Sequence, residues 1–282
     1  MEVKIIECPR DAMQGIAHNI PTERKIEFLR ALLACGFHTL DCGSFVNPAV
    51  VPQMADTAEV LEAIGPLRGN TQLLVIVGNE RGAETAAAVE SIGYIGFPFS
   101  VNDTFQQRNT KAGRDEAFER LKSIHRIAAD AGKETVAYIS MAFGNPYGDP
   151  YDRDEVVLWA NRIAALGIKT ISLSDTVGSA RVEDVQFLYD HLINRHIGVE
   201  FGAHFHSIPG RWMPKIAAAY HAGCRRFDGA ILGYGGCPMA ADTLTGNIPT
   251  EGLLSWLGEK TDTGIDKAAF AKAMAMAPEI YG

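Results

Sequence analysis

KTISLSDTVGSARVEDVQFLYDHLINRHIGVEFGAHFH, residues 169 to 206, contains one complete unit of the pattern that decides the fold. An apolar, β-branched run at 169 to 175 is followed by an amphipathic helical pattern at 181 to 195 and by a second strand-like run at 200 to 206. Strand, helix and strand in this order form a βαβ unit with parallel strands and a covering helix. This stretch therefore predicts an α/β fold on a parallel sheet.

The same alternation extends in both directions to the ends of the chain. The predicted strands are residues 3 to 7, 39 to 44, 72 to 77, 94 to 100, 135 to 141, 169 to 175, 200 to 206 and 225 to 231. The predicted helices are residues 23 to 34, 55 to 63, 81 to 91, 113 to 131, 152 to 165, 181 to 195, 211 to 222 and 250 to 260, with an extra C-terminal helix at 266 to 276. Units repeating at about 30 residues predict a single (β/α)8 TIM barrel spanning residues 1 to 282. A doubly wound sheet is the alternative, because it uses the same alternation.

Composition and charge narrow the class of protein. The 282 residues are 47% hydrophobic and carry 26 Lys and Arg against 34 Asp and Glu, a net charge of −8. This balance argues against binding to nucleic acid or to an anionic membrane. The five cysteines form no CxxC pair and the N-terminus lacks the layout of a signal peptide, so we expect a cytoplasmic protein.

In a TIM barrel the active site lies at the C-terminal ends of the strands. The reactive residue types of this chain are expected at that place: Arg10, Asp11, Asp41, Ser44, Asp175, His204, His206, Cys237 and Asn247. The two-residue period of a strand points His204 and His206 to the same face. Two neutral imidazoles and the carboxylate of Asp11 form a donor set for a divalent metal ion, whereas the alternative is a pair of packed core histidines.

The remaining candidates also have structural alternatives. Arg10 either pairs with Asp11 or binds a developing enolate oxygen. Asp41 and Asp175 either orient the arginine and the metal site or cap helices. Cys237 lies in the glycine-rich segment 233 to 238, where it either transfers protons over the barrel mouth or is incidental to a turn.

These residues occur within longer motifs that resemble a known family. The motifs are Pro-Arg-Asp-x-x-Gln at 9 to 14, Ser-Phe-Val-x-Pro at 44 to 48, Val-Pro-Gln-Met at 51 to 54, Asn-Pro-Tyr at 145 to 147, Ser-Asp-Thr-Val-Gly at 174 to 178, His-Phe-His at 204 to 206 and Gly-Gly-Cys-Pro at 235 to 238. Together they resemble the 3-hydroxy-3-methylglutaryl-CoA (HMG-CoA) lyases, members of a metal-dependent barrel group that includes the isopropylmalate and homocitrate synthases. The Gly-Gly-Cys-Pro motif favours the lyases over the synthases.

The resemblance implies a metal site, a reaction and catalytic residues. Mg²⁺ or Mn²⁺ would be held by Asp11, His204, His206 and Asn247. The catalytic set would be Arg10 for the enolate, Cys237 for proton transfer, Asp41 or His204 as the base, and Asp175 in support. The chain departs from the family pattern at Asp41, where glutamate is usual, and at Gly15 and Ala17, where asparagine and lysine are common near the coenzyme.

The expected activity is cleavage of HMG-CoA to acetyl-CoA and acetoacetate, with an acyl-CoA thioester as the bound partner. The alternatives are a lyase for another 3-hydroxy acyl-CoA, a Claisen-type synthase and a non-catalytic barrel that binds acyl-CoA. The residues that hold coenzyme A are not predicted. The apolar C-terminal helix is a candidate contact surface for a homodimer.

Overall fold

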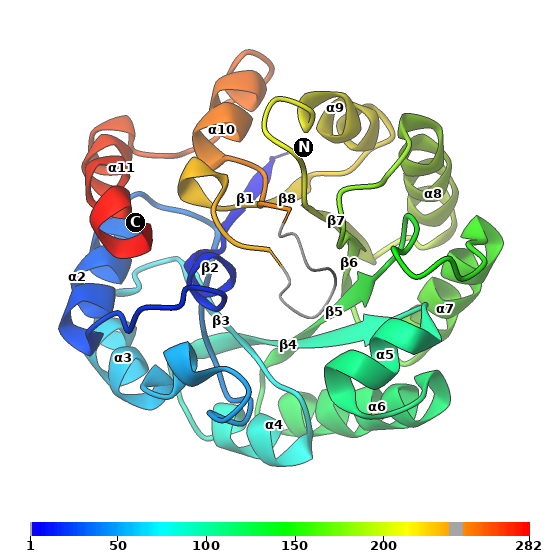
Figure 1. Cartoon of the computed structure of the whole chain (residues 1–282), viewed down its shortest axis with the longest axis horizontal. Helices are drawn as coiled ribbons and strands as arrows, with labels where there is room; N and C mark the ends of the chain where they lie inside the picture. Colours follow the sequence, from blue (N-terminus) through cyan, green and yellow to red (C-terminus); the bar gives the residue numbers. More distant parts are fainter. Residues whose placement is uncertain (1, 237–244) are drawn as a thin grey trace.

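The computed structural model, which describes residues 2–236 and 245–282, confirms the closed barrel (Figure 1). Its strands are β1 Lys4–Glu7, β2 Thr39–Ser44, β3 Gln72–Ile76, β4 Ile92–Ser100, β5 Glu134–Ser140, β6 Thr170–Asp175, β7 Glu200–Phe205 and β8 Arg226–Gly229. Each strand pairs in parallel with the next, and β1 pairs with β8 from Lys4 opposite Arg226 to Glu7 opposite Gly229. This last pairing closes the sheet and excludes the doubly wound alternative.

The helices surround the barrel and cover its outer face, as Figure 1 shows. All the predicted helices are present: α2 Thr22–Leu33, α3 Thr57–Ile64, α4 Glu80–Ala87, α6 Arg114–Asp130, α7 Arg153–Ala165, α8 Val182–Arg195, α9 Met213–His221, α10 Thr250–Gly258 and α11 Lys267–Tyr281. Two further helices, α1 Pro9–Met13 and α5 Asp103–Thr110, were not predicted. Both come shortly after a strand, at the end of the barrel where the C-terminal ends of the strands lie. Three short 3-10 turns complete the elements: η1 Pro52–Met54, η2 Gly65–Leu67 and η3 Ile231–Gly233.

Alternation along the strands divides the buried side chains into two sets. The larger apolar cluster packs the outer face of the sheet against the helices. A smaller cluster lies on the opposite face of three adjacent strands and consists of Leu74, Ile76, Tyr94, Val136 and Tyr138. Polar groups share this inner face, including the buried side chains of Ser172, Arg226 and Asp228. The barrel interior therefore contains charge directly beneath its mouth.

The C-terminal helix α11 packs against other parts of the same chain. Its Tyr281 ring meets Phe28 of α2 with ring centroids 5.6 Å apart, and its Phe270 ring lies 6.2 Å from Phe37. Much of its apolar character is thus explained by packing against the barrel. Within the described ranges, no helix combines the length and apolar character required to cross a membrane.

Candidate active site

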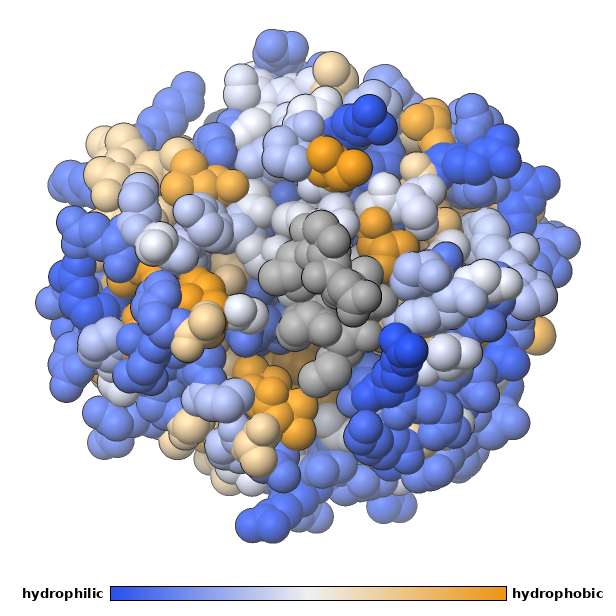
Figure 2. All heavy atoms as spheres, viewed as in Figure 1, coloured by the Kyte–Doolittle hydropathy of each residue, from blue (hydrophilic) through white to orange (hydrophobic). Residues whose placement is uncertain are grey.

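Most of the predicted site residues meet at the mouth of the barrel, although they come from distant parts of the chain. Arg10 and Asp11 lie in α1, Asp41 in β2, His204 in β7 and His206 directly after β7. Arg10, Asp11 and both histidines line a cavity of about 480 Å³. Figure 2 views the face at which the loops after the strands emerge, and shows it as mostly hydrophilic with separate hydrophobic patches.

The rest of the cavity wall combines apolar and cationic side chains. The apolar part includes Val46, Val50, Val51, Ile76 and Phe105. The cationic part includes Arg108 on α5, Lys111 directly after α5, and Arg120 on α6. An apolar wall with a few cations suits a substrate that has both a hydrocarbon part and negative charge.

Arg10 is fixed in place by carboxylates on two sides. Its Nε donates to both oxygens of Asp41 at 3.1 Å, and its Nη1 donates to Asp11 Oδ1 at 3.1 Å and to Gln14 Oε1 at 2.8 Å. Burial by itself lowers the pKa of Arg10, but the two carboxylates outweigh it and raise that pKa above its ordinary value. Burial raises the pKa of Asp41 to about 6, even though Arg10 opposes the shift. Arg10 therefore stays cationic and held in one orientation.

Asp11, His204 and His206 form the predicted donor set. Their ligand atoms all lie within 4.8 Å of one another, and His206 Nε2 lies 3.7 Å from Asp11 Oδ2. Burial opposes ionisation of Asp11, but Arg10 and the histidines outweigh it and lower its pKa. Burial lowers the pKa of His206 to about 4, so its imidazole is neutral at pH 7.

The donor set fits a divalent cation. His206 Nε2 is buried and has no hydrogen-bond partner among the described residues, which argues against a satisfied pair of core histidines. One carboxylate and two imidazoles are oxygen and nitrogen donors that divalent metal ions bind. This arrangement can hold a cation beside Arg10 and present both to the cavity.

Asn247 also reaches this cluster. Its Nδ2 donates to Asp11 Oδ2 at 2.7 Å and to the Tyr234 carbonyl at 2.9 Å. Because Pro249 occupies the N-cap of α10, Asn247 is not the cap of that helix. The side chain thus contacts Asp11 of the donor set.

Asp175 occupies a different position from the other predicted carboxylates. Its Oδ2 accepts a hydrogen bond from Lys215 and its Oδ1 accepts from the Ala180 amide at 3.0 Å. Lys215 also donates to the His206 carbonyl at 2.9 Å. Asp175 is neither the N-cap of α8, which is Arg181, nor part of the cavity wall. Its contacts connect it to the backbone of His206.

Cys237, predicted for proton transfer, lies outside the described residues. Residues that the sequence did not single out also contribute to the site. Gln14 bonds both Arg10 and Asp11, and Asp228 bonds His204. Gln14 lies one helical turn after Arg10, and Asp228 lies near the end of β8; both positions can be recognised from the sequence. Amide and carboxylate groups are common at such positions, so they did not indicate a site.

Comparisons with known proteins agree with this geometry. The HMGL-like family model matches residues 2–276. A hydroxymethylglutaryl-CoA lyase of Pseudomonas mevalonii is 30% identical over 96% of this chain and 89% of that protein. A 3-hydroxy-3-isohexenylglutaryl-CoA/hydroxymethylglutaryl-CoA lyase of Pseudomonas aeruginosa is 31% identical over 96% of this chain and 90% of that protein.

A solved structure is similarly close. An HMG-CoA lyase from Acenitobacter baumannii, in complex with coenzyme A and 3-methylmalate, superposes with a TM-score of 0.90 and 27% identity, covering 100% of this chain and 92% of that one. Fold, donor set and sequence similarity therefore agree, and this chain belongs to the HMGL-like family.

Proposed function

We propose that this protein is an HMG-CoA lyase that cleaves HMG-CoA to acetyl-CoA and acetoacetate with a divalent metal ion. The observation that carries the proposal is the juxtaposition of Arg10, held by Asp41, with the cluster of Asp11, His204 and His206 at one cavity. Family membership supports the same reaction class.

Mg²⁺ or Mn²⁺ would be held by Asp11, His204 and His206, with the side-chain oxygen of Asn247 as a fourth ligand. When bound, the ion would supply Lewis acidity at the tertiary hydroxyl and a carboxylate oxygen of the substrate. Asn247 would have to turn its amide oxygen toward the ion, since its Nδ2 now faces Asp11.

The chain's own residues would then guide the bond cleavage. Asp41 or His204 would take the proton of the tertiary hydroxyl as the base. The bond between C2 and C3 then breaks, C3 becomes the keto carbon of acetoacetate, and the electron pair of the bond moves to the thioester as an enolate. Arg10 is placed to stabilise the charge that develops on the thioester oxygen, and Asp41 holds it with little need for reorganisation. Asp41 directs both oxygens to Arg10, and His204 belongs to the proposed metal set, so both candidate bases lie at the site. Following the resemblance, we assign the separate return of a proton to the enolate carbon to Cys237.

The acyl specificity is a separate part of the proposal. A relative acts on a 3-isohexenyl as well as a 3-methyl substrate, according to its name. The apolar wall of this cavity, with Val46, Val50 and Ile76, would also accept an alkyl group larger than methyl. A lyase for a bulkier 3-hydroxy-3-alkylglutaryl-CoA is therefore the second candidate.

The test is to incubate purified protein with HMG-CoA and with 3-alkyl homologues, with and without Mn²⁺, and to measure acetoacetate or its homologue together with acetyl-CoA. Stoichiometric, metal-dependent release of both products is expected. Binding without turnover would instead identify a non-catalytic acyl-CoA-binding barrel. Condensation without cleavage would identify a synthase.

Cytoplasmic location and a homodimer also belong to this proposal. The predicted contact helix α11 packs against α2, so that helix gives the dimer less support than its sequence suggested. Light scattering on the purified protein measures the oligomeric state directly.

A further inference from the structure

We propose that Asp228, supported by Arg226, is a positioning residue that fixes the tautomer and orientation of His204 so that its Nε2 faces Asp11 and His206. This inference rests on the proposed function only where it concerns metal binding. The hydrogen bond between Asp228 and His204 and the charges around it do not depend on the substrate.

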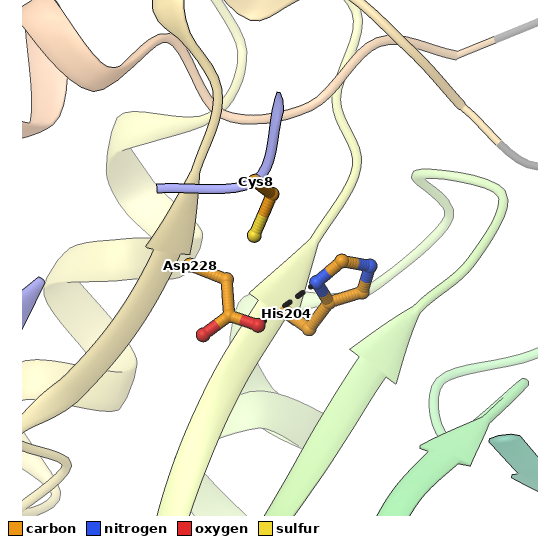
Figure 3. Close-up of side chains that lie close together, drawn as sticks. All are labelled: Cys8, His204 and Asp228. Atoms are coloured by element: carbon orange, nitrogen blue, oxygen red, sulfur yellow. Dashed lines mark hydrogen bonds and ion pairs between the residues drawn. The ribbon is translucent and has the colours of Figure 1, made fainter. Parts of the chain in front are cut away.

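The two residues come from neighbouring strands at the barrel mouth. Asp228 Oδ2 lies 3.0 Å from His204 Nδ1, and the two side chains are 1% and 12% exposed. Figure 3 shows Asp228 reaching from β8 toward the imidazole on β7. Asp228 is absent from the cavity wall, whereas His204 is part of it. At that cavity Asp228 contacts the donor set through His204.

The hydrogen bond to Asp228 determines which nitrogen of the His204 imidazole is available to bind a cation. A carboxylate accepts hydrogen bonds but cannot donate one, so when the imidazole of His204 gives up a proton to bind a cation, the proton that stays lies on Nδ1. The lone pair then lies on Nε2, the only nitrogen left to bind a cation. A carboxylate behind a metal-bound histidine is a general means of orienting the ring and raising its basicity.

Arg226 lies two residues before Asp228 on β8, on the same face of the strand, and attraction to Asp228 helps to raise the pKa of Arg226 above its ordinary value against the effect of burial. Its side chain is fully buried, its nearest ion-pair contact is Glu200 at 3.6 Å, and none of its guanidinium nitrogens has a hydrogen-bond partner among the described residues. Asp228 Oδ1 likewise lacks a hydrogen-bond partner in that part of the chain. The cation of Arg226 therefore attracts the carboxylate of Asp228.

The barrel makes room for this arginine at a specific position. A Cβ added at Gly202 would lie 2.6 Å from Ser172 Oγ and 3.1 Å from Arg226 Cδ. Placing a large cation here requires a glycine on the adjacent strand. An arginine that served only to fill space could be replaced by an apolar side chain at lower electrostatic cost.

Cys8 provides a matched control. Its thiol lies close to both Asp228 and His204 (Figure 3), but among the described residues its one hydrogen-bond contact is to the Ile6 carbonyl at 3.9 Å. A change at Cys8 disturbs the packing around the pair without removing the bond between Asp228 and His204.

The first experiment measures Mn²⁺ binding, by titration with electron paramagnetic resonance, to the wild type and to Asp228→Asn, Arg226→Met, the double variant and Cys8→Ser. Asp228→Asn should weaken Mn²⁺ binding by roughly 10- to 100-fold, because its amide can donate to Nδ1 and move the proton to Nε2. Arg226→Met should weaken it less, and the double variant no more than Asp228→Asn, because Arg226 acts through Asp228. Cys8→Ser should stay within about threefold of the wild type.

Equal Mn²⁺ affinity of Asp228→Asn and the wild type would overturn the inference, as would additive losses in the double variant. If the wild type binds no Mn²⁺ at all, the metal-dependent function fails. A second experiment then still tests Asp228: long-range ¹H–¹⁵N correlation spectra of the metal-free wild type at pH 9 report the tautomer of His204. Protonated Nδ1 is expected, and protonated Nε2 would overturn the inference even if the variants do not fold.

Discussion

At the scale of single residues, Arg10 illustrates how the site is prepared before substrate arrives. Its guanidinium is held from two sides by Asp41 and Asp11. We expect Arg10→Lys to lose roughly a thousandfold in kcat, because an ammonium group cannot reproduce the planar set of donors. Steady-state kinetics with HMG-CoA measures the effect, and Arg24→Lys on α2, whose side chain is 42% exposed, should leave kcat unchanged. A loss confined to KM would make Arg10 a binding residue only.

The cysteines differ in expected reactivity. Burial raises the pKa of Cys35 and of Cys224 to about 12, and it raises the pKa of Cys8 and Cys42 as well. Such thiols are poor nucleophiles at pH 8. We therefore expect iodoacetamide at pH 8 to inactivate the enzyme by alkylating Cys237, as mass spectrometry of the peptides would show. Alkylation of a different cysteine, or a Cys237→Ser variant with wild-type turnover, would show that Cys237 is incidental.

Glu7 gives a pH dependence of stability. Burial raises its pKa to about 8 from 4.5, although bonds to Thr250 and to the Ile231 amide oppose the shift. Because the folded state holds the proton more tightly, this contribution to stability is complete below about pH 4.5 and is lost as the pH rises through about 8. Glu7→Gln should therefore be more stable than the wild type by roughly 2 to 4 kcal/mol at pH 9 and nearly equal to it at pH 5.

Urea unfolding at the two pH values, with each variant compared with the wild type at the same pH, measures this difference. A stability difference that is the same at pH 5 and pH 9 would show that Glu7 is ionised in the folded protein throughout.

At the scale of elements, the packing of α4 depends on one glycine. Asn79 caps this helix by accepting from the Gly82 amide at 3.0 Å, and a Cβ at Gly82 would lie 2.7 Å from the Phe45 carbonyl oxygen. Gly82→Ala should cost roughly 1 to 3 kcal/mol, because a backbone atom cannot move aside easily. The control is Gly258→Ala at the end of α10, which meets nothing within 4 Å and should be neutral or stabilising by up to about 1 kcal/mol. Equal effects in denaturant unfolding would contradict this account.

The two helices that the sequence did not predict belong to this scale as well. α1 has five residues and begins directly after Cys8, and α5 has eight residues and begins after Asn102. α1 is too short to display a helical period, and α5 has Phe105 as its one apolar residue, so it lacks the repeating apolar positions that α3 and α4 show at the same length. The side-chain cap from Asn102 to the Phe105 amide was a visible signal, but Asn also starts many turns.

At the scale of the whole molecule, the proposed cation site joins α1, directly after the first strand, to β7 and the residue that follows it. A ligand that binds only the folded state raises its stability by about 2.7 kcal/mol at 100 times its Kd. Mn²⁺ at that concentration should therefore raise Tm by roughly 5 °C. Differential scanning calorimetry measures the shift, and His206→Ala should abolish it. A shift of the same size in His206→Ala would place the bound ion elsewhere.

The sequence by itself determined the alternation of strands and helices, because side-chain periodicity and turn residues act locally. It also placed His204 and His206 on one face, since a strand repeats every two residues. Only the tertiary structure decided which side chain each carboxylate binds. Asp41 bonds Arg10, Asp175 bonds Lys215, and Asp228 bonds His204. These pairings join residues 24 to 40 positions apart, and they depend on the closure of the barrel and the register of adjacent strands. No local pattern in the sequence encodes them.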